Sequence, residues 1–288
     1  MSFIAAVSLI FILLCSWTPL SCGEPERRAN FTLEELYNLQ SRIFDHTIAL
    51  ESSINSSLLA PNIRGRVDIT RQFTGSELNT EYLFGLFAQL NITRAFTLLG
   101  IPTAYTITHF TGFRDVASSA TLMNFTSPFW GAFTLEIHVW TQFDARGRAA
   151  QYEATFRHWD LFVDEALARV ARARFDGSLP ATLAYAADAL ARTICRDHEV
   201  HCAGADRQYE SEEGCYEFLT KGVPFGKPHE MGLDTLLCRM VHDPMVALRP
   251  GVHCPHIGPG GGDMCTDALT YGERIDQAFW EGPWMPEW

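Results

Sequence analysis

The spacing of apolar residues changes twice along the chain, from a helical period to an alternating one and back. Apolar side chains recur every three or four positions over residues 33–50 and again over 77–90, which predicts two amphipathic helices. Residues 52–66 contain a proline and are expected to form a loop or a short helix, followed by a brief strand over 67–70.

The middle of the chain has the period of β-structure. Apolar and polar residues alternate in four segments rich in Thr, Val, Ile, Phe and Tyr, which predict strands at 103–110, 115–125, 132–143 and 148–157. Short turns separate these segments, so we expect an antiparallel, strongly curved sheet. Helices packed into such a sheet would form an α+β cone with an open mouth.

After the strands, the helical period returns over residues 159–174 and 179–195. Beyond residue 195 the sequence predicts mostly loops, and the most irregular stretch is the glycine-rich segment 258–262.

The N-terminus has the pattern of a secretory signal. Residues 3–14 are apolar, a length that suits a signal peptide and is too short for a membrane span of about 20 residues. We therefore expect a signal peptide at 1–23, cleaved before Glu24, and a protein of the secretory pathway, secreted or held in a vesicular lumen. Because no basic residue precedes the apolar run, an uncleaved anchor is the alternative. No later segment predicts stable membrane insertion.

Asparagine-linked glycosylation is predicted independently of the leader. Four Asn-x-Ser/Thr triplets without an internal proline begin at Asn30, Asn55, Asn91 and Asn124. Attached glycans are bulky and hydrophilic, so these asparagines should lie on the surface.

Six cysteines remain after the leader, and all lie in the last third of the chain: Cys195, Cys202, Cys215, Cys238, Cys254 and Cys265. In a secreted chain this predicts three disulfides, with 15 pairings open. The alternative is a thiolate zinc site completed by neighbouring histidines, namely His198, His201, His253 and His256. An oxidising compartment disfavours thiolate ligands, so no metal is assigned.

Charge and missing motifs narrow the classes of function. A net charge of −12 argues against nucleic acid and anionic membrane surfaces as partners. The chain has no Gly-x-Ser-x-Gly elbow, Walker loop, dinucleotide-binding glycine fingerprint or His-Glu-x-x-His motif. The expected partner is therefore a small hydrophobic molecule, with no cofactor implied.

Short sequence segments within residues 33–158 resemble those of the SnoaL-like branch of the NTF2-like superfamily. They are the segments 65–70, 78–82 and 143–148, the last being a turn that leads into a strand ending Tyr-x-Ala-x-Phe. The resemblance implies a cone over residues 24–175, with 176–288 forming a helix and a cysteine-rich extension.

The segment from His229 to Cys265 resembles an extension found in fungal secreted SnoaL-like proteins of secondary metabolism. Among these are hetero-Diels–Alderases that join a tropolone quinone methide to a humulene-type sesquiterpene. The resemblance implies a cofactor-independent cyclase. A secreted non-catalytic binder of a small hydrophobic ligand is the alternative, as is a dehydratase or hydrolase on the same fold.

Candidate catalytic residues lie on the predicted strands. Glu136 and His138 share a strand face and would form an acid–base pair, while Trp140 beside them could stack on a flat substrate. These roles require this face of the strand to line the cone interior; the alternative is that it is the convex, solvated face. His109 and Tyr105 share a face of another strand and are assigned catalytic and substrate-binding roles, respectively.

Further substrate contacts are expected at the edges of the cone. Phe129 and Trp130 lie at a turn between strands, where a pocket lip would be, and Asp68 and Arg71 lie near the sheet edge. The last two could instead pair with each other. Tryptophans at 280, 284 and 288 could close the mouth, pack on the body or form a homodimer contact. His253 and His256 could donate protons or hydrogen-bond a loop carbonyl.

Overall fold

A computed structural model describes residues 29–51, 54–267 and 270–276, without the side chains of 275 and 276. The predicted signal peptide and the three C-terminal tryptophans lie outside these residues. In the described part, no helix combines the length and the apolar character that a membrane span requires.

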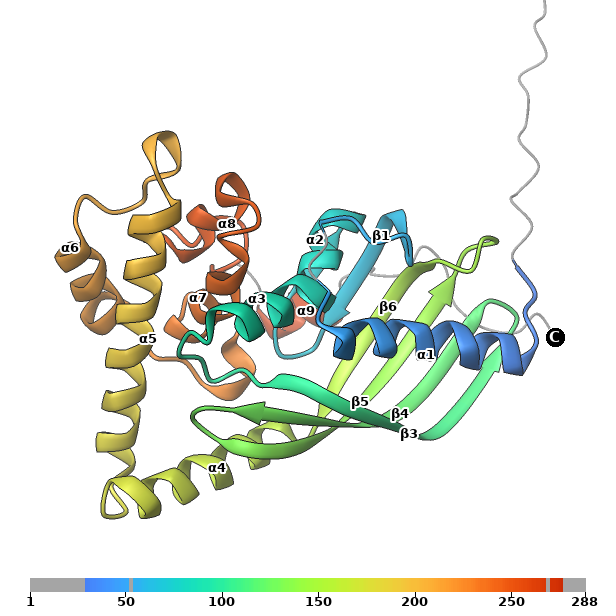
Figure 1. Cartoon of the computed structure of the whole chain (residues 1–288), viewed down its shortest axis with the longest axis horizontal. Coiled ribbons are helices and arrows are strands. Elements are labelled where there is room, and N and C mark those ends of the chain that lie inside the picture. The colour runs from blue at the N-terminus through green and yellow to red at the C-terminus, as the bar shows by residue number, and fades with distance from the viewer. Residues whose placement is uncertain (1–28, 52–53, 268–269, 277–288) are drawn as a thin grey trace, which may run out of the picture.

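The expected α+β cone is confirmed. A six-stranded sheet in the order β2-β1-β6-β5-β4-β3 curves around the helix α1, Leu33–Ala49, which runs along its concave face (Figure 1). The strands are β1 (Leu59–Val67), β2 (Gln72–Thr74), β3 (Ile101–Phe113), β4 (Val116–Ser127), β5 (Gly131–Phe143) and β6 (Ala149–Arg157). The four predicted strands are β3 to β6, and their pairings are antiparallel as expected.

The sheet is mixed, and the expectation for residues 52–66 is wrong. Most of this segment is β1, which pairs in parallel with β6 and antiparallel with β2. Its register shifts between Leu59 and Arg64, so its residues lack a regular alternation. A Cβ at Gly65 would lie 2.3 Å from both Asn79 Oδ1 and the Tyr152 ring, so the strand passes too close to its neighbours for a side chain.

The helix predicted at 77–90 is present with a wider turn inside it. It consists of α2 (Ser76–Thr80), a π-helical turn (Glu81–Gly85) and α3 (Leu86–Thr93). Single π-turns inside α-helices are frequent at functional sites. Here the turn buries Glu81 completely and Tyr82 almost completely.

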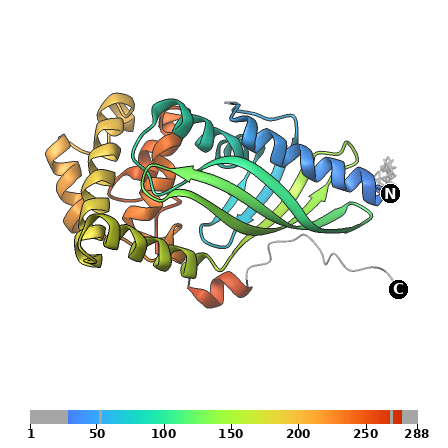
Figure 2. The same ribbon diagram turned by 60° about the horizontal axis from the view of Figure 1, so that its bottom comes forward.

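The extension is more helical than the sequence suggests. After α4 (Trp159–Arg174) and α5 (Leu179–His201), it contains the short helices α6 (Glu212–Glu217), α7 (Leu236–His242), α8 (Pro250–Ile257) and α9 (Tyr271–Asp276). Helices of six to eight residues are too short to show a clear period. Figures 1 and 2 show α5 to α8 gathered at one end of the sheet.

The predicted disulfides are confirmed, and the fold selects one pairing. Cys195–Cys215 joins α5 to α6, Cys202–Cys254 joins the end of α5 to α8, and Cys238–Cys265 joins α7 to the following loop. All six cysteines are buried. The thiolate zinc alternative is therefore wrong.

The largest hydrophobic cluster is shared by cone and extension. It joins Phe73 and Leu86 of the cone to Met240, Val241 and Met245 of the extension. Removing the extension would thus expose apolar surface of the cone, at a cost of roughly 25 cal/mol per Å².

The side chains of three sequon asparagines, Asn30, Asn55 and Asn124, are exposed, and that of Asn91 is half-buried. Their glycosylation stays a prediction.

Candidate functional site

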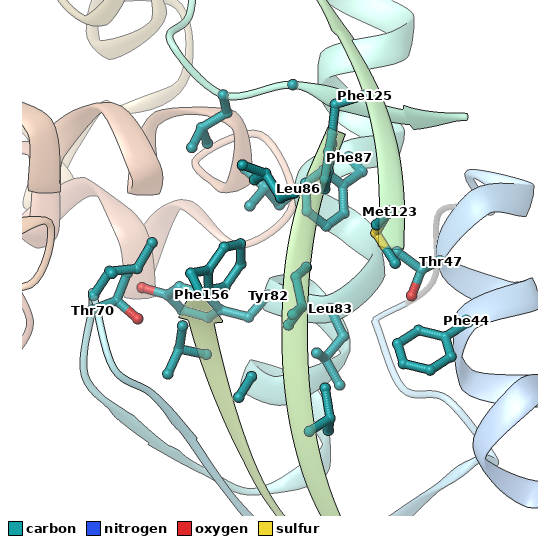
Figure 3. Close-up of a pocket in the computed structure, with 18 of the residues that line it drawn as sticks. Phe44, Thr47, Thr70, Tyr82, Leu83, Leu86, Phe87, Met123, Phe125 and Phe156 are labelled. Atoms are coloured by element: carbon teal, nitrogen blue, oxygen red, sulfur yellow. The ribbon is translucent and has the colours of Figure 1, made fainter. Parts of the chain in front are cut away.

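A cavity of about 180 Å³ lies inside the cone, between the sheet and the helices α1 and α3 (Figure 3). Its walls are almost entirely apolar, and many are aromatic. The aromatic wall residues include Phe44, Phe87, Phe125, Phe133, Phe156 and Trp159. Two residues of the extension, Met231 and Val241, complete the wall. Such a lining suits a flat, unsaturated small molecule.

Alternation along β5 decides which residues reach the cavity. Leu135, Ile137, Val139 and Thr141 line it, so the even-numbered residues between them point to the other face of the sheet. The expectation that Glu136, His138 and Trp140 line the pocket is therefore wrong. The alternative, that this face is convex and solvated, is confirmed, and Trp140 is 49% exposed.

On the convex face, Glu136 forms hydrogen bonds with two neighbours. Its Oε1 lies 2.8 Å from His138 Nε2 and accepts a hydrogen bond of 2.9 Å from Arg157. The hydrogen bond with His138 and then that with Arg157 hold the pKa of Glu136 below its usual range. A solvated group of this kind contributes little stability.

Substituting His138 by alanine should leave both ligand binding and product formation unchanged, because its imidazole and the cavity lie on opposite faces of the sheet. Binding and turnover assays of the variant check this expectation. A loss of turnover with unchanged binding would return His138 to the reacting centre.

Neither candidate on β3 lines the cavity. The Tyr105 hydroxyl donates to Asp45 Oδ1 at 2.7 Å, while its ring packs against Phe44 with 5.2 Å between ring centroids. Burial and then the hydrogen bond to Asp45 raise the pKa of Tyr105 to about 12. His109 is exposed and contacts Thr108.

Phe129 and Trp130 are core residues rather than a pocket lip. Both are about 95% buried, and neither contributes to the cavity wall. The Trp130 indole N–H donates to the Leu98 carbonyl at 2.6 Å, and Arg169 donates to the Trp130 carbonyl at 2.9 Å. These bonds fix the β4–β5 turn to the segment before β3 and to the helix α4.

Asp68 and Arg71 are engaged with other partners rather than with each other. Asp68 Oδ1 accepts from the Phe156 backbone N–H at 3.2 Å. The Arg71 guanidinium donates to the carbonyls of Gly232 and Thr266, which ties the cone to the extension. Neither side chain lines the cavity.

Four residues of the cavity wall carry buried polar atoms that the sequence-based assignment missed. Gln40 Oε1, Thr70 Oγ1, Thr141 Oγ1 and Tyr152 Oη are buried without a hydrogen-bond partner among the described residues. Each such atom costs about 1–3 kcal/mol. The sequence did indicate one of them, because Gln40 lies at helical spacing between Leu36 and Phe44, on the buried face of α1.

Tyr152 is the strongest hydrogen-bond donor in this set. Burial raises the pKa of its phenol far above neutrality, so the hydroxyl stays protonated. A protonated phenol can donate to a ligand oxygen, and Gln40 Oε1 can accept from a ligand hydroxyl. The cavity can therefore hold an apolar molecule and orient its few polar atoms.

Two groups of described residues have the spacing of metal ligands. In one, the sulfurs of Cys238 and Cys265 are bonded to each other, which leaves them unavailable as thiolates. The other consists of His242, His253 and His256, which lie behind the cavity residue Tyr82.

Comparison with known proteins gives a consistent set of matches. The BfoA N-terminal domain matches residues 39–154, and the BfoA family C-terminal domain matches residues 158–268. Bifonsecin B biosynthesis cluster protein A of Aspergillus brasiliensis is 39% identical over 280 residues, covering 95% of this chain and 92% of that protein. Aurasperone B biosynthesis cluster protein A of Aspergillus niger is 39% identical over 277 residues, covering 93% and 90%.

Solved structures are similar only at low identity. A putative SnoaL-like polyketide cyclase from a Jannaschia species has 12% identity and a TM-score of 0.36, covering 46% of this chain and 91% of that one. A putative isomerase from Bacillus subtilis has 10% identity and a TM-score of 0.35, covering 50% and 95%.

Proposed function

Because this chain belongs to the BfoA family, with relatives named as biosynthesis cluster proteins, we propose that it acts in secondary metabolism as a cyclase. Its substrate is a small, apolar, unsaturated intermediate held inside the cone. The observation that carries the proposal is the aromatic cavity with four buried polar atoms that have no partner among the described residues.

The cavity residues would act by orientation. Holding reacting groups in a near-attack geometry can supply roughly 7–11 kcal/mol of a barrier. The Tyr152 hydroxyl would donate to a carbonyl or ether oxygen on which charge develops during ring closure. These roles use side chains of this chain alone and imply no cofactor.

A hetero-Diels–Alder reaction is the finer form of this proposal. A tropolone quinone methide and a humulene-type sesquiterpene are both apolar and would suit the aromatic walls. The cycloaddition converts three π bonds, two of the quinone methide and one of the alkene, into a carbon–carbon σ bond, a carbon–oxygen σ bond and one new carbon–carbon π bond, with no proton gained or lost. Glu136 and His138 lie on the convex face of the sheet and do not line the cavity, so loss of water to form the methide is assigned to no residue here.

The alternative is a non-catalytic carrier of the same kind of ligand. The nearly complete apolar lining of the cavity favours it, because binding alone needs few polar groups. In either case we place the protein in the lumen of the secretory pathway, with no nucleic-acid or membrane partner. Its three disulfides support this placement, since they persist in oxidising compartments.

A deletion strain distinguishes these functions. We expect loss of the gene to make a pathway intermediate accumulate, and purified protein to convert that isolated intermediate to a cyclised product. Binding without any rate above the enzyme-free control would establish the carrier. An unchanged metabolite profile together with no binding would reject both.

A further inference from the structure

Three histidines of the extension turn the same ring nitrogen toward one point. His242 ends α7, and His253 and His256 lie one turn apart on α8. Their Nδ1 atoms are separated by 2.9 Å (His242 to His256), 3.3 Å (His253 to His256) and 3.4 Å (His242 to His253). All three side chains are at least 97% buried.

The partners of the opposite ring nitrogens, the Nε2 atoms, determine where most of the histidine protons lie. His253 Nε2 lies 3.0 Å from Glu81 Oε2, and His256 Nε2 lies 2.6 Å from Asp263 Oδ1. A carboxylate only accepts, so both Nε2 atoms carry the proton and donate it. In the neutral ring, Nδ1 then holds a lone pair. His242 Nε2 contacts the Tyr82 hydroxyl at 2.6 Å, which can donate or accept.

Hydrogen bonds among the histidines cannot satisfy this arrangement. A proton on His242 Nδ1 could be donated to Nδ1 of either His253 or His256. The Nδ1 lone pair of the other histidine would then have no donor within the cluster. A cation at the centre would satisfy all three. Nitrogens bound to zinc at about 2.0–2.1 Å in tetrahedral geometry lie about 3.3–3.4 Å apart. The separations of 3.4 Å and 3.3 Å match this value, and that of 2.9 Å between His242 and His256 is shorter.

We propose that His242, His253 and His256 bind one Zn²⁺ ion through their Nδ1 atoms, with the fourth position left for water or another exogenous ligand. Three imidazoles and an open position are a common zinc ligand set. This site is distinct from the cavity and does not depend on the function proposed for it.

The surroundings are those of a metal centre. Ligating histidines usually donate their other N–H to a carboxylate, as His253 does to Glu81 and His256 to Asp263. Glu81 Oε2 in turn accepts a hydrogen bond of 2.6 Å from Arg249 Nη2.

Disulfides hold the ligands in place. Cys254 follows His253 directly and is bonded to Cys202, while Cys238 lies one helical turn before His242 and is bonded to Cys265. The ligands come from the extension, and two of their partners, Glu81 and Tyr82, come from the π-turn of the cone. The ion would therefore join the two parts, directly behind Tyr82 of the cavity wall.

The test measures metal in the full protein, purified from a secretory host so that its disulfides form. Elemental analysis should find close to one zinc ion per chain. Removing it with a chelator should lower the melting temperature, and returning Zn²⁺ but not Mg²⁺ should restore it. Co²⁺ in its place should give the visible absorption of a tetrahedral site.

Variants assign the ligands. His253→Gln and His256→Gln should each lose most of the bound zinc and the rise in melting temperature on zinc addition. The control His229→Gln changes an exposed histidine of the extension and should keep both. If the variants do not fold, the wild-type titration still decides. A wild-type protein without zinc that gains no stability from added Zn²⁺ overturns the proposal, as does His253→Gln with full zinc content.

Discussion

Tyr152→Phe is expected to lower the rate of product formation by about 10²-fold while leaving the protein at least as stable as the wild type. Tyr152 lines the cavity, and its hydroxyl is buried without a hydrogen-bond partner among the described residues. Deleting it therefore removes an unsatisfied polar group rather than a bond. The rate falls because the substrate oxygen loses its donor. Steady-state kinetics and urea unfolding of the same preparation measure the two effects.

Tyr209→Phe is the matched control. Tyr209 is also a buried tyrosine, but its hydroxyl donates to the Ile257 carbonyl at 2.8 Å, inside the extension. Its loss should cost about 1 kcal/mol of unfolding free energy and leave the rate unchanged. If Tyr152→Phe destabilises the fold and keeps full activity, the hydroxyl has a structural partner and no role in the reaction.

Arg239→Met should reduce the free energy of unfolding by about 3–5 kcal/mol. Arg239 is fully buried, and it donates to the carbonyls of Thr235 at 3.1 Å and of Gly258 and Pro259 at 3.2 Å. The Asp234 carboxylate lies 2.8 Å from the guanidinium. Methionine fills a similar volume but leaves three carbonyls without their donor, which makes the loss large.

Arg239→Lys should recover only part of this stability, because an ammonium cannot reproduce the planar fork that reaches carbonyls on two sides. Arg192→Met is the control, since Arg192 pairs with Asp188 at the surface of α5, and it should change stability by less than about 0.5 kcal/mol. The midpoints of urea unfolding give the comparison. An Arg239→Met midpoint equal to that of the control contradicts the assigned role.

Much of the fold could be predicted from local periods. The helix α1 and the strands β3 to β6 have the period of one element over nine or more residues, and their positions in the sequence were correct. The strand β1 was missed because it is held by a parallel pairing with β6, about 90 residues away, rather than by its own alternation. The short helices of the extension were missed because disulfides and side-chain caps such as Thr235 define them.

The candidate site was harder to predict for a physical reason. A period of two separates Glu136 from Leu135 but does not say which face of β5 is concave, and that depends on where α1 packs. The histidine cluster was missed because His242 and His253 are 11 positions apart and meet only when α7 packs on α8. The sequence shows the chemistry of each residue, whereas which side chains meet in one site depends on tertiary packing.

One pair of variants tests most directly whether the cone interior is the working site. Ala154 lines the cavity, whereas Thr155, the next residue of β6, is exposed and pairs with His138 on the convex face. The measurement is the rate at which each variant converts the intermediate that accumulates in the deletion strain. Ala154→Phe, which fills the cavity, should abolish conversion, while Thr155→Phe should match the wild type. Full activity of a folded Ala154→Phe, or loss of activity in Thr155→Phe alone, would contradict the assignment of the cavity.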